Sequence, residues 1–311
     1  MKHTIHAGDV ANILPTLDAD SFDAVLCDPP YGLNFKGKKW DHGVPSKEVW
    51  SEVLRVLKPG AHVMAFGGTR TFHRLTCAIE DSGFAIRDCL SWLYGSGFPK
   101  GHNVSKAIDK AAGVEREVVG ERRQRGTVNG SAPMNTCSAP VEYLTAPATP
   151  LAQQFDGYGT ALKPAWEPVI LAMKATDGTF AANALEHGVA GLNIDGSRIG
   201  KRWPANLILD EEAGPAVGDA ARFFYCSKAP KKERGDSKHP TLKPLSLTEY
   251  LAKMLLPPPH ADGTPRRILV PFSGAGSEMI GCLRAGWDDV VGIEIDPQYV
   301  ADAEERITEL A

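Results

Sequence analysis

Mainly apolar runs alternate with amphipathic stretches along the first third of the chain. Residues 22–27 and 61–66 each predict a buried strand, and residues 46–57 predict a helix that ends before Pro59. The same pattern predicts further strands at 4–9 and 84–93 and further helices at 10–17 and 70–82. Strands that alternate with helices indicate a parallel sheet covered by helices on both faces.

The alternation stops in the middle of the chain and returns near its end. Residues 95–165 and 175–240 are rich in Gly, Pro, Ser and Thr and show no sustained period, except for short extended pieces at 203–209 and 222–226. Between these regions, residues 166–173 predict a strand, and Pro168 indicates either an edge position or a start at Val169. The last predicted elements are helix 245–256, strand 267–270, helix 277–285, strand 290–295 and helix 297–310. We expect one doubly wound, Rossmann-like α/β domain that carries an irregular insertion.

Composition agrees with a soluble globular protein. The chain has 311 residues, of which 43% are hydrophobic and 23% charged, and its net charge is −4. It has no run of eighteen apolar residues and no apolar core of a signal peptide, so we expect a cytoplasmic protein without a membrane partner. Its six cysteines form no Cys-x-x-Cys pair, which predicts buried, reduced thiols and no metal site.

The most distinctive motif, Asp28-Pro29-Pro30-Tyr31, directly follows the strand predicted at 22–27. Two successive prolines fix φ and remove two backbone donors, so this corner presents oxygen acceptors beside an aromatic ring. Such a corner suits a planar ring that carries an exocyclic amino group. The same residues are also typical of a stiff turn at a strand end, so the motif needs support from elsewhere in the chain.

A second motif, Gly274-Ala275-Gly276, lies between a predicted strand and a predicted helix, and the next strand ends near Glu294. Glycines let the backbone approach a ligand closely, and an acid at this position can bind a ribose diol. The pattern therefore indicates a cofactor that contains adenosine. The Gly-x-Gly-x-x-Gly spacing of dinucleotide sites and the Gly-Lys-Ser of phosphate loops are both absent, which favours S-adenosylmethionine.

These two motifs, together with Gly8-Asp9 and the segment His239-Pro240-Thr241-Leu242-Lys243-Pro244, resemble those of the DNA amino-methyltransferases. The match is to the circularly permuted beta class, in which the catalytic motif precedes the cofactor motif. It covers residues 1–94, 166–174 and 239–311. The resemblance implies the fold of S-adenosylmethionine-dependent methyltransferases, with variable DNA-contacting segments in the remaining chain.

The resemblance also implies a role for each motif. Asp28 and the carbonyl of Pro29 would accept hydrogen bonds from the target amino group, Pro30 would complete the corner, and Tyr31 would stack on the flipped base. Contacts with the cofactor are implied for Asp9, Asp28, Thr241, Lys243, Pro244, Pro271, Phe272, Ser273, Gly274, Ala275, Gly276, Ser277, Glu294 and Ile295. One residue departs from the pattern: the family usually has Asp-Pro-Phe where this chain has Val270-Pro271-Phe272. The cofactor's ammonium then needs another acceptor, for which Asp28 is the candidate.

Local positive charge marks the candidate DNA contacts, because phosphate binding depends on patches and not on net charge. Residues 100–125 contain seven Lys/Arg against four Asp/Glu, and residues 228–243 contain six against two. The basic residues proposed to bind DNA are Lys36, Lys38, Lys39, Lys100, Arg122, Arg123, Lys231 and Lys232. The expected organisation is a catalytic half at 1–94, a basic insertion at 95–165, a sheet strand at 166–174, a target-recognition region at 175–238 and a cofactor-binding half at 239–311.

The expected reaction is direct methyl transfer from S-adenosylmethionine to a base amino group of double-stranded DNA. Within the family, a motif that begins with Asp and not Ser favours adenine N6 over cytosine N4, although both amines fit the acceptors. Carbon-5 methylation would require a thiolate, usually in Pro-Cys, and this dipeptide is absent. An RNA or small-amine methyltransferase and a non-catalytic DNA-binding module remain alternatives. A monomer and a homodimer fit equally, with or without a cognate restriction endonuclease.

Overall fold

The structure, a computed structural model, describes residues 2–33, 43–95, 97, 101–123, 141–227 and 242–311. It divides into two compact units. The first comprises Met1–Gly95 and Trp166–Ala311, and the second comprises Ser96–Ala165. The segment that interrupts the alternating pattern therefore forms a unit of its own.

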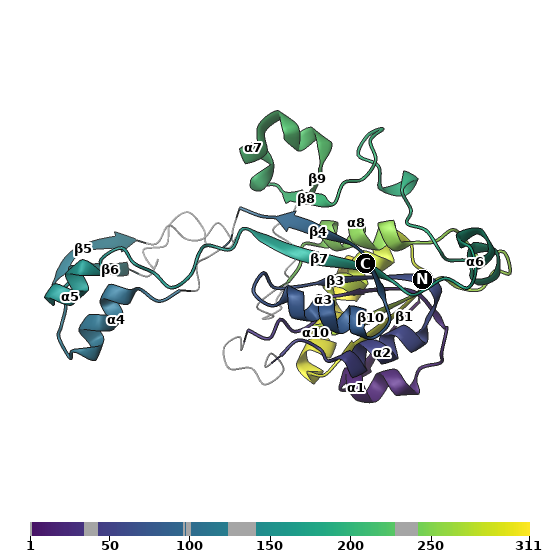
Figure 1. Ribbon diagram of the computed structural model, residues 1–311, viewed down its shortest axis with the longest axis horizontal. Helices are drawn as coiled ribbons and strands as arrows, with labels where there is room; N and C mark the ends of the chain where they lie inside the picture. The colour runs from purple at the N-terminus through teal and green to yellow at the C-terminus, as the bar shows by residue number, and fades with distance from the viewer. Residues whose placement is uncertain (1, 34–42, 96, 98–100, 124–140, 228–241) are drawn as a thin grey trace. The chain divides into compact units, whose positions relative to one another are not determined.

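A mostly parallel sheet forms the centre of the first unit (Figure 1). In the described part of the chain its order is β1-β11-β10-β2-β3-β7-β4-β8-β9, and only β7 runs antiparallel to its neighbours. This arrangement confirms the expected doubly wound α/β fold. The strands are β1 (Lys2–Ala7), β2 (Phe22–Cys27), β3 (Leu57–Phe66), β4 (Ala85–Leu93), β7 (Trp166–Met173), β8 (Leu207–Asp210), β9 (Tyr225–Ser227), β10 (Arg267–Pro271) and β11 (Asp289–Glu294).

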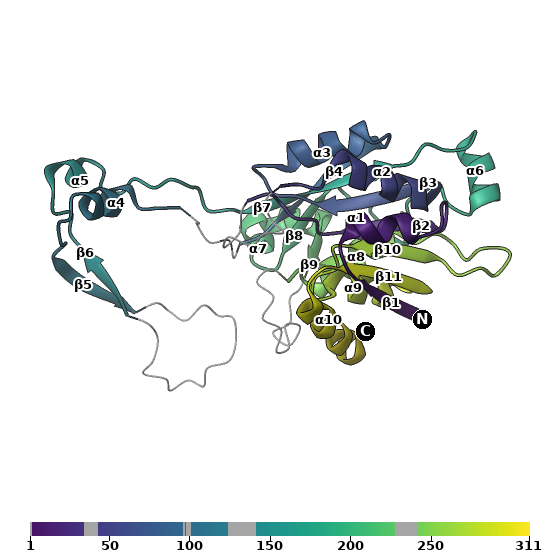
Figure 2. The same ribbon diagram turned by 90° about the horizontal axis from the view of Figure 1, so that it is seen from below.

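Helices cover both faces of this sheet, as Figure 2 shows. One layer contains α1 (Val10–Ile13), α2 (Lys47–Val56) and α3 (Phe72–Asp81), and the other contains α8 (Leu245–Leu255), α9 (Ser277–Ala285) and α10 (Pro297–Leu310). Successive side chains of a strand point to opposite faces, so Val25 packs in the core cluster of Trp50 and Leu26 in that of Leu251. Burial on both faces explains the nearly continuous apolar runs of the central strands.

Strand β7 has the predicted bounds, but neither interpretation of Pro168 was correct. Pro168 suggests an edge strand or a start at Val169, whereas β7 begins at Trp166 and lies between β3 and β4. Its ladder with β3 begins only at Val169, opposite Phe66, so Pro168 lies one residue beyond the ladder. The missing N–H of Pro168 therefore breaks no bond to β3, and its carbonyl accepts a hydrogen bond from the amide of Gly67 at 2.9 Å.

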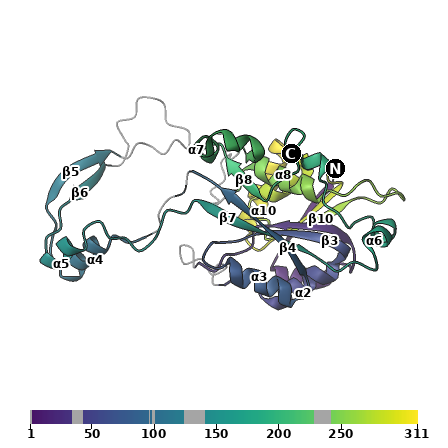
Figure 3. The same cartoon turned by 45° about the horizontal axis from the view of Figure 1, so that its top comes forward.

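The second unit is more regular than its composition suggests (Figure 3). It contains α4 (Val104–Ala111), the antiparallel pair β5 (Val118–Arg123) and β6 (Val141–Thr145), and α5 (Pro150–Gln154). A buried ion pair joins these elements: Arg116 donates to Asp109 at 2.8 Å, and Asp109 also accepts from the amide and hydroxyl of Thr149. The expectation of irregular chain was wrong here, because a polar network holds elements that show little hydrophobic periodicity.

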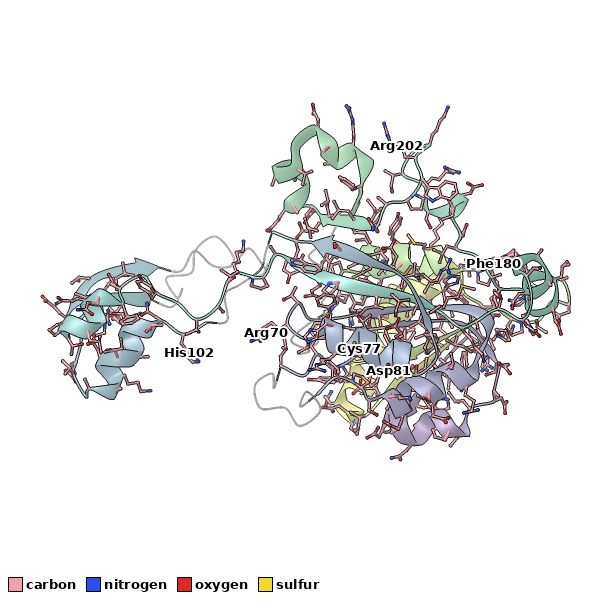
Figure 4. All side chains as sticks on the ribbon, viewed as in Figure 1. Arg70, Cys77, Asp81, His102, Phe180 and Arg202 are labelled. Atoms are coloured by element: carbon pink, nitrogen blue, oxygen red, sulfur yellow. The ribbon has the colours of Figure 1, made fainter. Side chains whose placement is uncertain are left out.

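Short elements also occur between β7 and α8, where the sequence predicts mostly irregular chain. They are α6 (Phe180–His187) and α7 (Ala213–Val217), in addition to β8 and β9. Among the described residues, no helix has the length and apolar character needed to cross a bilayer. Cys27 and Cys282 are buried free thiols, as expected, whereas Cys77, labelled on α3 in Figure 4, is exposed.

Candidate active site

The two sequence motifs meet at a point where the sheet's connections reverse direction. Strands β2 and β10 are neighbours, but β2 continues through α2 to β3 whereas β10 continues through α9 to β11 on the opposite face. Such a switch point leaves a crevice outside the carboxyl ends of the strands, where ligands of open α/β sheets bind. The Asp28–Tyr31 corner follows β2 and the glycine loop follows β10, so motifs from opposite ends of the chain share one crevice.

Three contacts fix Tyr31 in the corner. The hydroxyl of Thr71 donates to the Tyr31 carbonyl at 2.6 Å, and the Tyr31 phenol donates to the carboxylate of Glu167 at 3.1 Å. Gly68 lies against the side chain, since a Cβ at this position would be only 3.0 Å from Tyr31 Cδ2. The ring of Tyr31 is therefore held at both its backbone and its hydroxyl.

Lys243 is the centre of the corner's charge network. Its ammonium donates to Asp28 Oδ2 at 2.7 Å and to the Tyr31 oxygen at 3.0 Å, and it lies 3.2 Å from Glu167 Oε2. It also lies 4.8 Å from the centre of the Phe66 ring, within range of a cation–π interaction. Burial alone would lower the pKa of Lys243, but Asp28 and Glu167 outweigh it and raise that pKa above its ordinary value. Lys243 thus has its partners at the Asp28–Tyr31 corner, although the sequence motif implies a contact with the cofactor.

The corner contains one carboxylate oxygen that is not hydrogen-bonded within the described residues, together with uncharged tyrosine side chains. Asp28 Oδ1 is buried and has no hydrogen-bond partner among the described residues. Burial and the negative charges of Asp28 and Glu167 raise the pKa of Tyr31, which keeps its phenol protonated. Burial and Glu167 likewise raise the pKa of Tyr94 to about 12, and its ring centre lies 5.0 Å from that of the buried Trp92.

The glycine loop has the backbone needed for close approach to a ligand. Phe272, Gly274 and Gly276 have φ values of +63°, +50° and +81°, a region that residues other than glycine rarely adopt. A non-glycine residue held in this region is a form of local strain that occurs often at ligand sites. At Gly276 a Cβ would also lie 3.0 Å from the Cβ of Ala303 on α10, so this position has little room for a side chain.

Glu294 ties the loop to the neighbouring strand. Its carboxylate accepts hydrogen bonds from the amides of Gly274 and Asp296, both at 2.8 Å, and burial raises its pKa. Its carbonyl accepts from the amide of Gly8 at 2.8 Å, and the adjacent Asp9 caps α1 by accepting from the Ala11 amide. Ile295 leaves 51% of its surface exposed beside this acid, an apolar face of the kind that a purine ring can cover.

The remaining motif residues lie at the ends of elements. Pro271 ends β10, Pro244 precedes α8 as its cap, and Ser277 begins α9. Arg306 of α10 donates to the carbonyl of Ala275 and contacts Ser277 Oγ. Thr241 and the proposed DNA-binding residues Lys36, Lys38, Lys39, Lys100, Lys231 and Lys232 fall outside the described residues. Arg122 and Arg123 end β5 in the second unit, so they are not part of the unit that holds the crevice.

Two acids of this site were missed by the sequence analysis. Glu167 lies in the second position of β7, and because β7 is antiparallel its first residues reach the edge where the parallel strands end. Glu278 follows the glycine loop and is buried in α9. An acid inside an otherwise apolar strand or helix is the signal that marks both, because such a residue is rarely buried without a function or a partner.

The crevice fits S-adenosylmethionine in its donor and acceptor chemistry. Asp28 Oδ1, Ser273 Oγ and Glu278 Oε1 are buried oxygens without a hydrogen-bond partner in the described part of the chain. Unpaired acceptors suit a ligand that brings positive charge and N–H groups. The loop glycines have the backbone conformation for close approach and Ile295 is exposed, features that suit an adenosyl group.

A doubly wound sheet with an acceptor-rich corner and a glycine loop at one switch point defines a methyltransferase of the Rossmann-like class. The chain belongs to the DNA methylase family that modifies adenine N6 or cytosine N4, whose family model matches residues 22–305. Its cofactor is S-adenosylmethionine and its substrate is DNA. The resemblance inferred from the motifs is therefore confirmed at the level of the family.

Known proteins agree with this assignment. The chain is 24% identical to the type II methyltransferase M.HindIII of Haemophilus influenzae, over 90% of this chain and 87% of that protein. Among solved structures, the PvuII DNA methyltransferase, described as cytosine-N4-specific, matches with a TM-score of 0.54 and 16% identity over 100% of this chain and 91% of that one. The complex of M1.HpyAVI with S-adenosylmethionine matches with a TM-score of 0.51 and 17% identity over 98% and 99%. At these identities the two structures support the fold alone.

Proposed function

We propose that this enzyme methylates the exocyclic N6 of adenine in double-stranded DNA, with Asp28 and Tyr31 as the residues that bind the flipped base. The observation that carries the proposal is Asp28 Oδ1, which is buried without a hydrogen-bond partner among the described residues and belongs to a carboxylate that Lys243 links to Tyr31. An acceptor at the edge of an aromatic surface matches an adenine that is stacked on one face and presents an amino group at its edge.

The proposed mechanism rests on acceptors that are already in place. An exocyclic amine is a weak nucleophile because its lone pair is delocalised into the ring. Asp28 Oδ1 and the Pro29 carbonyl accept hydrogen bonds from its two N–H groups, which favours a pyramidal nitrogen and stabilises the positive charge that develops there. When bound, S-adenosylmethionine would supply an electrophilic methyl group and leave as S-adenosylhomocysteine, so no covalent enzyme intermediate is required. The methylated nitrogen then loses one proton to water.

The surrounding residues position the corner for this step. Lys243 holds the other oxygen of Asp28, and Glu167 and Thr71 hold the hydroxyl and the carbonyl of Tyr31. Flipping the base out of the duplex costs a few kcal/mol, and stacking on Tyr31 offsets part of this cost. Preorganisation matters because the acceptors then need not reorient when charge develops.

The choice of adenine rests on the leading Asp of the motif, which the family associates with adenine more than with cytosine. Cytosine N4 is the second candidate, since its amine fits the same acceptors and the PvuII enzyme of similar fold is described as acting on it.

We propose phosphate contacts for the basic residues at 36–39, 100, 122–123 and 231–232.

Modified-base sequencing of DNA from a host that expresses the protein tests this proposal. We expect N6-methyladenine at one short recurrent sequence, and none in a host that expresses Asp28→Ala. N4-methylcytosine at a recurrent sequence would overturn the choice of adenine and keep the enzyme class. DNA without either base would contradict the proposed substrate.

A further inference from the structure

Glu278 is a buried acid that the methyl-transfer step does not use. It lies in the first turn of α9, two residues after Gly276, and only 4% of its surface is exposed. Its Oε1 is buried without a hydrogen-bond partner among the described residues. A buried, unpaired acceptor costs about 1–3 kcal/mol and more when charged, so a structural acid would be expected to have a partner.

The side chain is buried among charges of the Asp28–Tyr31 corner. The ionisable groups that interact with it are Asp28 and Cys27 at the end of β2, Lys243 before α8, Cys282 on α9, and Arg306 on α10. Burial, and then the charge of Asp28, raise the pKa of Glu278 to about 7, although Lys243 and Arg306 act in the opposite direction. Glu278 therefore lies at the border between the catalytic corner and the glycine loop.

The charges at this border are unbalanced. Asp28, Glu167 and Glu278 are three acids, whereas Lys243, which contacts the first two, and Arg306, whose charge acts on Glu278, are two cations. Arg306 donates hydrogen bonds to the carbonyl of Ala275 and the hydroxyl of Ser277. A ligand that carries net positive charge would restore the balance, whereas an anionic ligand would be repelled.

The neighbouring strand lacks an acid on the same side of the sheet. Val270 is fully buried in the core cluster that also contains Met279 and Cys282 of α9. The family's usual Asp at this position would supply an acceptor that Val270 cannot. Glu278 approaches the same loop from the helix that packs on that face, so it can provide a carboxylate where the strand does not.

We propose that Glu278 binds the ammonium group of the cofactor's methionine portion, in the role that Val270 cannot fill. This inference rests on the proposed assignment of the glycine loop to the cofactor. Glu278 then takes the place of Asp28 as the expected acceptor for the ammonium, and Asp28 Oδ1 stays available for the target amine.

Binding of the cofactor to Glu278 should depend on pH. A carboxyl whose pKa is raised on folding contributes stability below its unfolded pKa, and loses it as the pH rises through the folded value of about 7. Binding a cation favours the ionised form, so affinity for the cofactor is expected to fall about five- to tenfold from pH 8 to pH 6. With Gln at this position the fall should be absent.

Calorimetric binding of two probes to Glu278→Gln tests the assignment without any turnover. S-Adenosylhomocysteine carries the ammonium, and 5′-methylthioadenosine has the same adenosyl thioether without the amino acid. We expect the variant to bind the first about tenfold more weakly at pH 8 and the second within about twofold, the difference reflecting a lost charge-assisted hydrogen bond. Glu305→Gln, the same change on the exposed face of α10, is the control and should bind both as the wild type does.

Thermal unfolding separates this role from a structural one. Because a buried charge is removed, the Tm of Glu278→Gln at pH 8 should stay equal or rise by about 2 °C. Equal weakening of both probes by Glu278→Gln, or unchanged binding of S-adenosylhomocysteine, would overturn the role of Glu278. The assignment of the cofactor site would then stand. Failure of the wild type to bind either probe would overturn the cofactor site itself and the inference with it.

Discussion

The substitution Asp28→Asn is expected to lower kcat for DNA methylation by about 10²- to 10³-fold, the usual effect of removing one preorganised group at the reacting atom. The amide keeps the shape of the side chain, but it loses the charge that stabilises the developing cation on the amine. S-Adenosylhomocysteine affinity should stay within about threefold, because we assign the cofactor's ammonium to Glu278. The measurement is steady-state transfer of labelled methyl groups to duplex DNA, together with calorimetric binding.

Asp81→Asn provides a matched control, since Asp81 is exposed at the end of α3 (Figure 4). It should turn over at the wild-type rate. The far-UV circular dichroism of Asp28→Asn should match the wild type, which shows that the loss lies in chemistry and not in folding. A rate within a few-fold of the wild type would contradict the role of Asp28 as the acceptor.

The substitution Lys243→Met is expected to lower the free energy of unfolding by about 3 kcal/mol at pH 8, the magnitude for breaking a buried ion pair on one side. The side chain of Lys243 is only 6% exposed and contacts Asp28 and Glu167. Methionine fills a similar volume but leaves two partly buried carboxylates without their cation. Urea unfolding monitored by tryptophan fluorescence gives the difference.

An exposed lysine on the following helix provides the matched control. Lys253→Met changes the same side chain on the exposed face of α8 and should cost little stability at pH 8. An unchanged stability of Lys243→Met at pH 8 would show that the network is not a stabilising one.

Elements with a strong local period could be predicted from sequence. Strand β2 and helices α9 and α10 have the predicted bounds, because the apolar run and the helical spacing each end at a clear break. The meeting of the two motifs also follows from sequence, since carboxyl ends of parallel strands share one edge. The second unit could not be predicted in this way: its elements are joined by Asp109 and Arg116, and a polar pair leaves no hydrophobic pattern.

The partners within the site depend on tertiary structure. Glu167 reaches the corner because β7 runs antiparallel, and strand direction cannot be read from a single apolar run. Lys243 belongs to a motif that was read as part of the cofactor site, yet its ammonium reaches across to Asp28 at 2.7 Å. Side-chain contacts between residues far apart in the chain are set by the packing of the sheet and helices, so the sequence identifies the groups better than their partners.

The most direct test of the central claim is methyl transfer by the purified protein. Wild type and Asp28→Asn are incubated with duplex DNA and S-adenosylmethionine labelled in its methyl group, and the DNA is then digested to nucleosides and separated by chromatography. We predict label in N6-methyl-2′-deoxyadenosine with the wild type, and about 10²-fold less label in this nucleoside with Asp28→Asn. Label absent from both N6-methyladenine and N4-methylcytosine nucleosides, with active protein bound to its cofactor, would contradict the account.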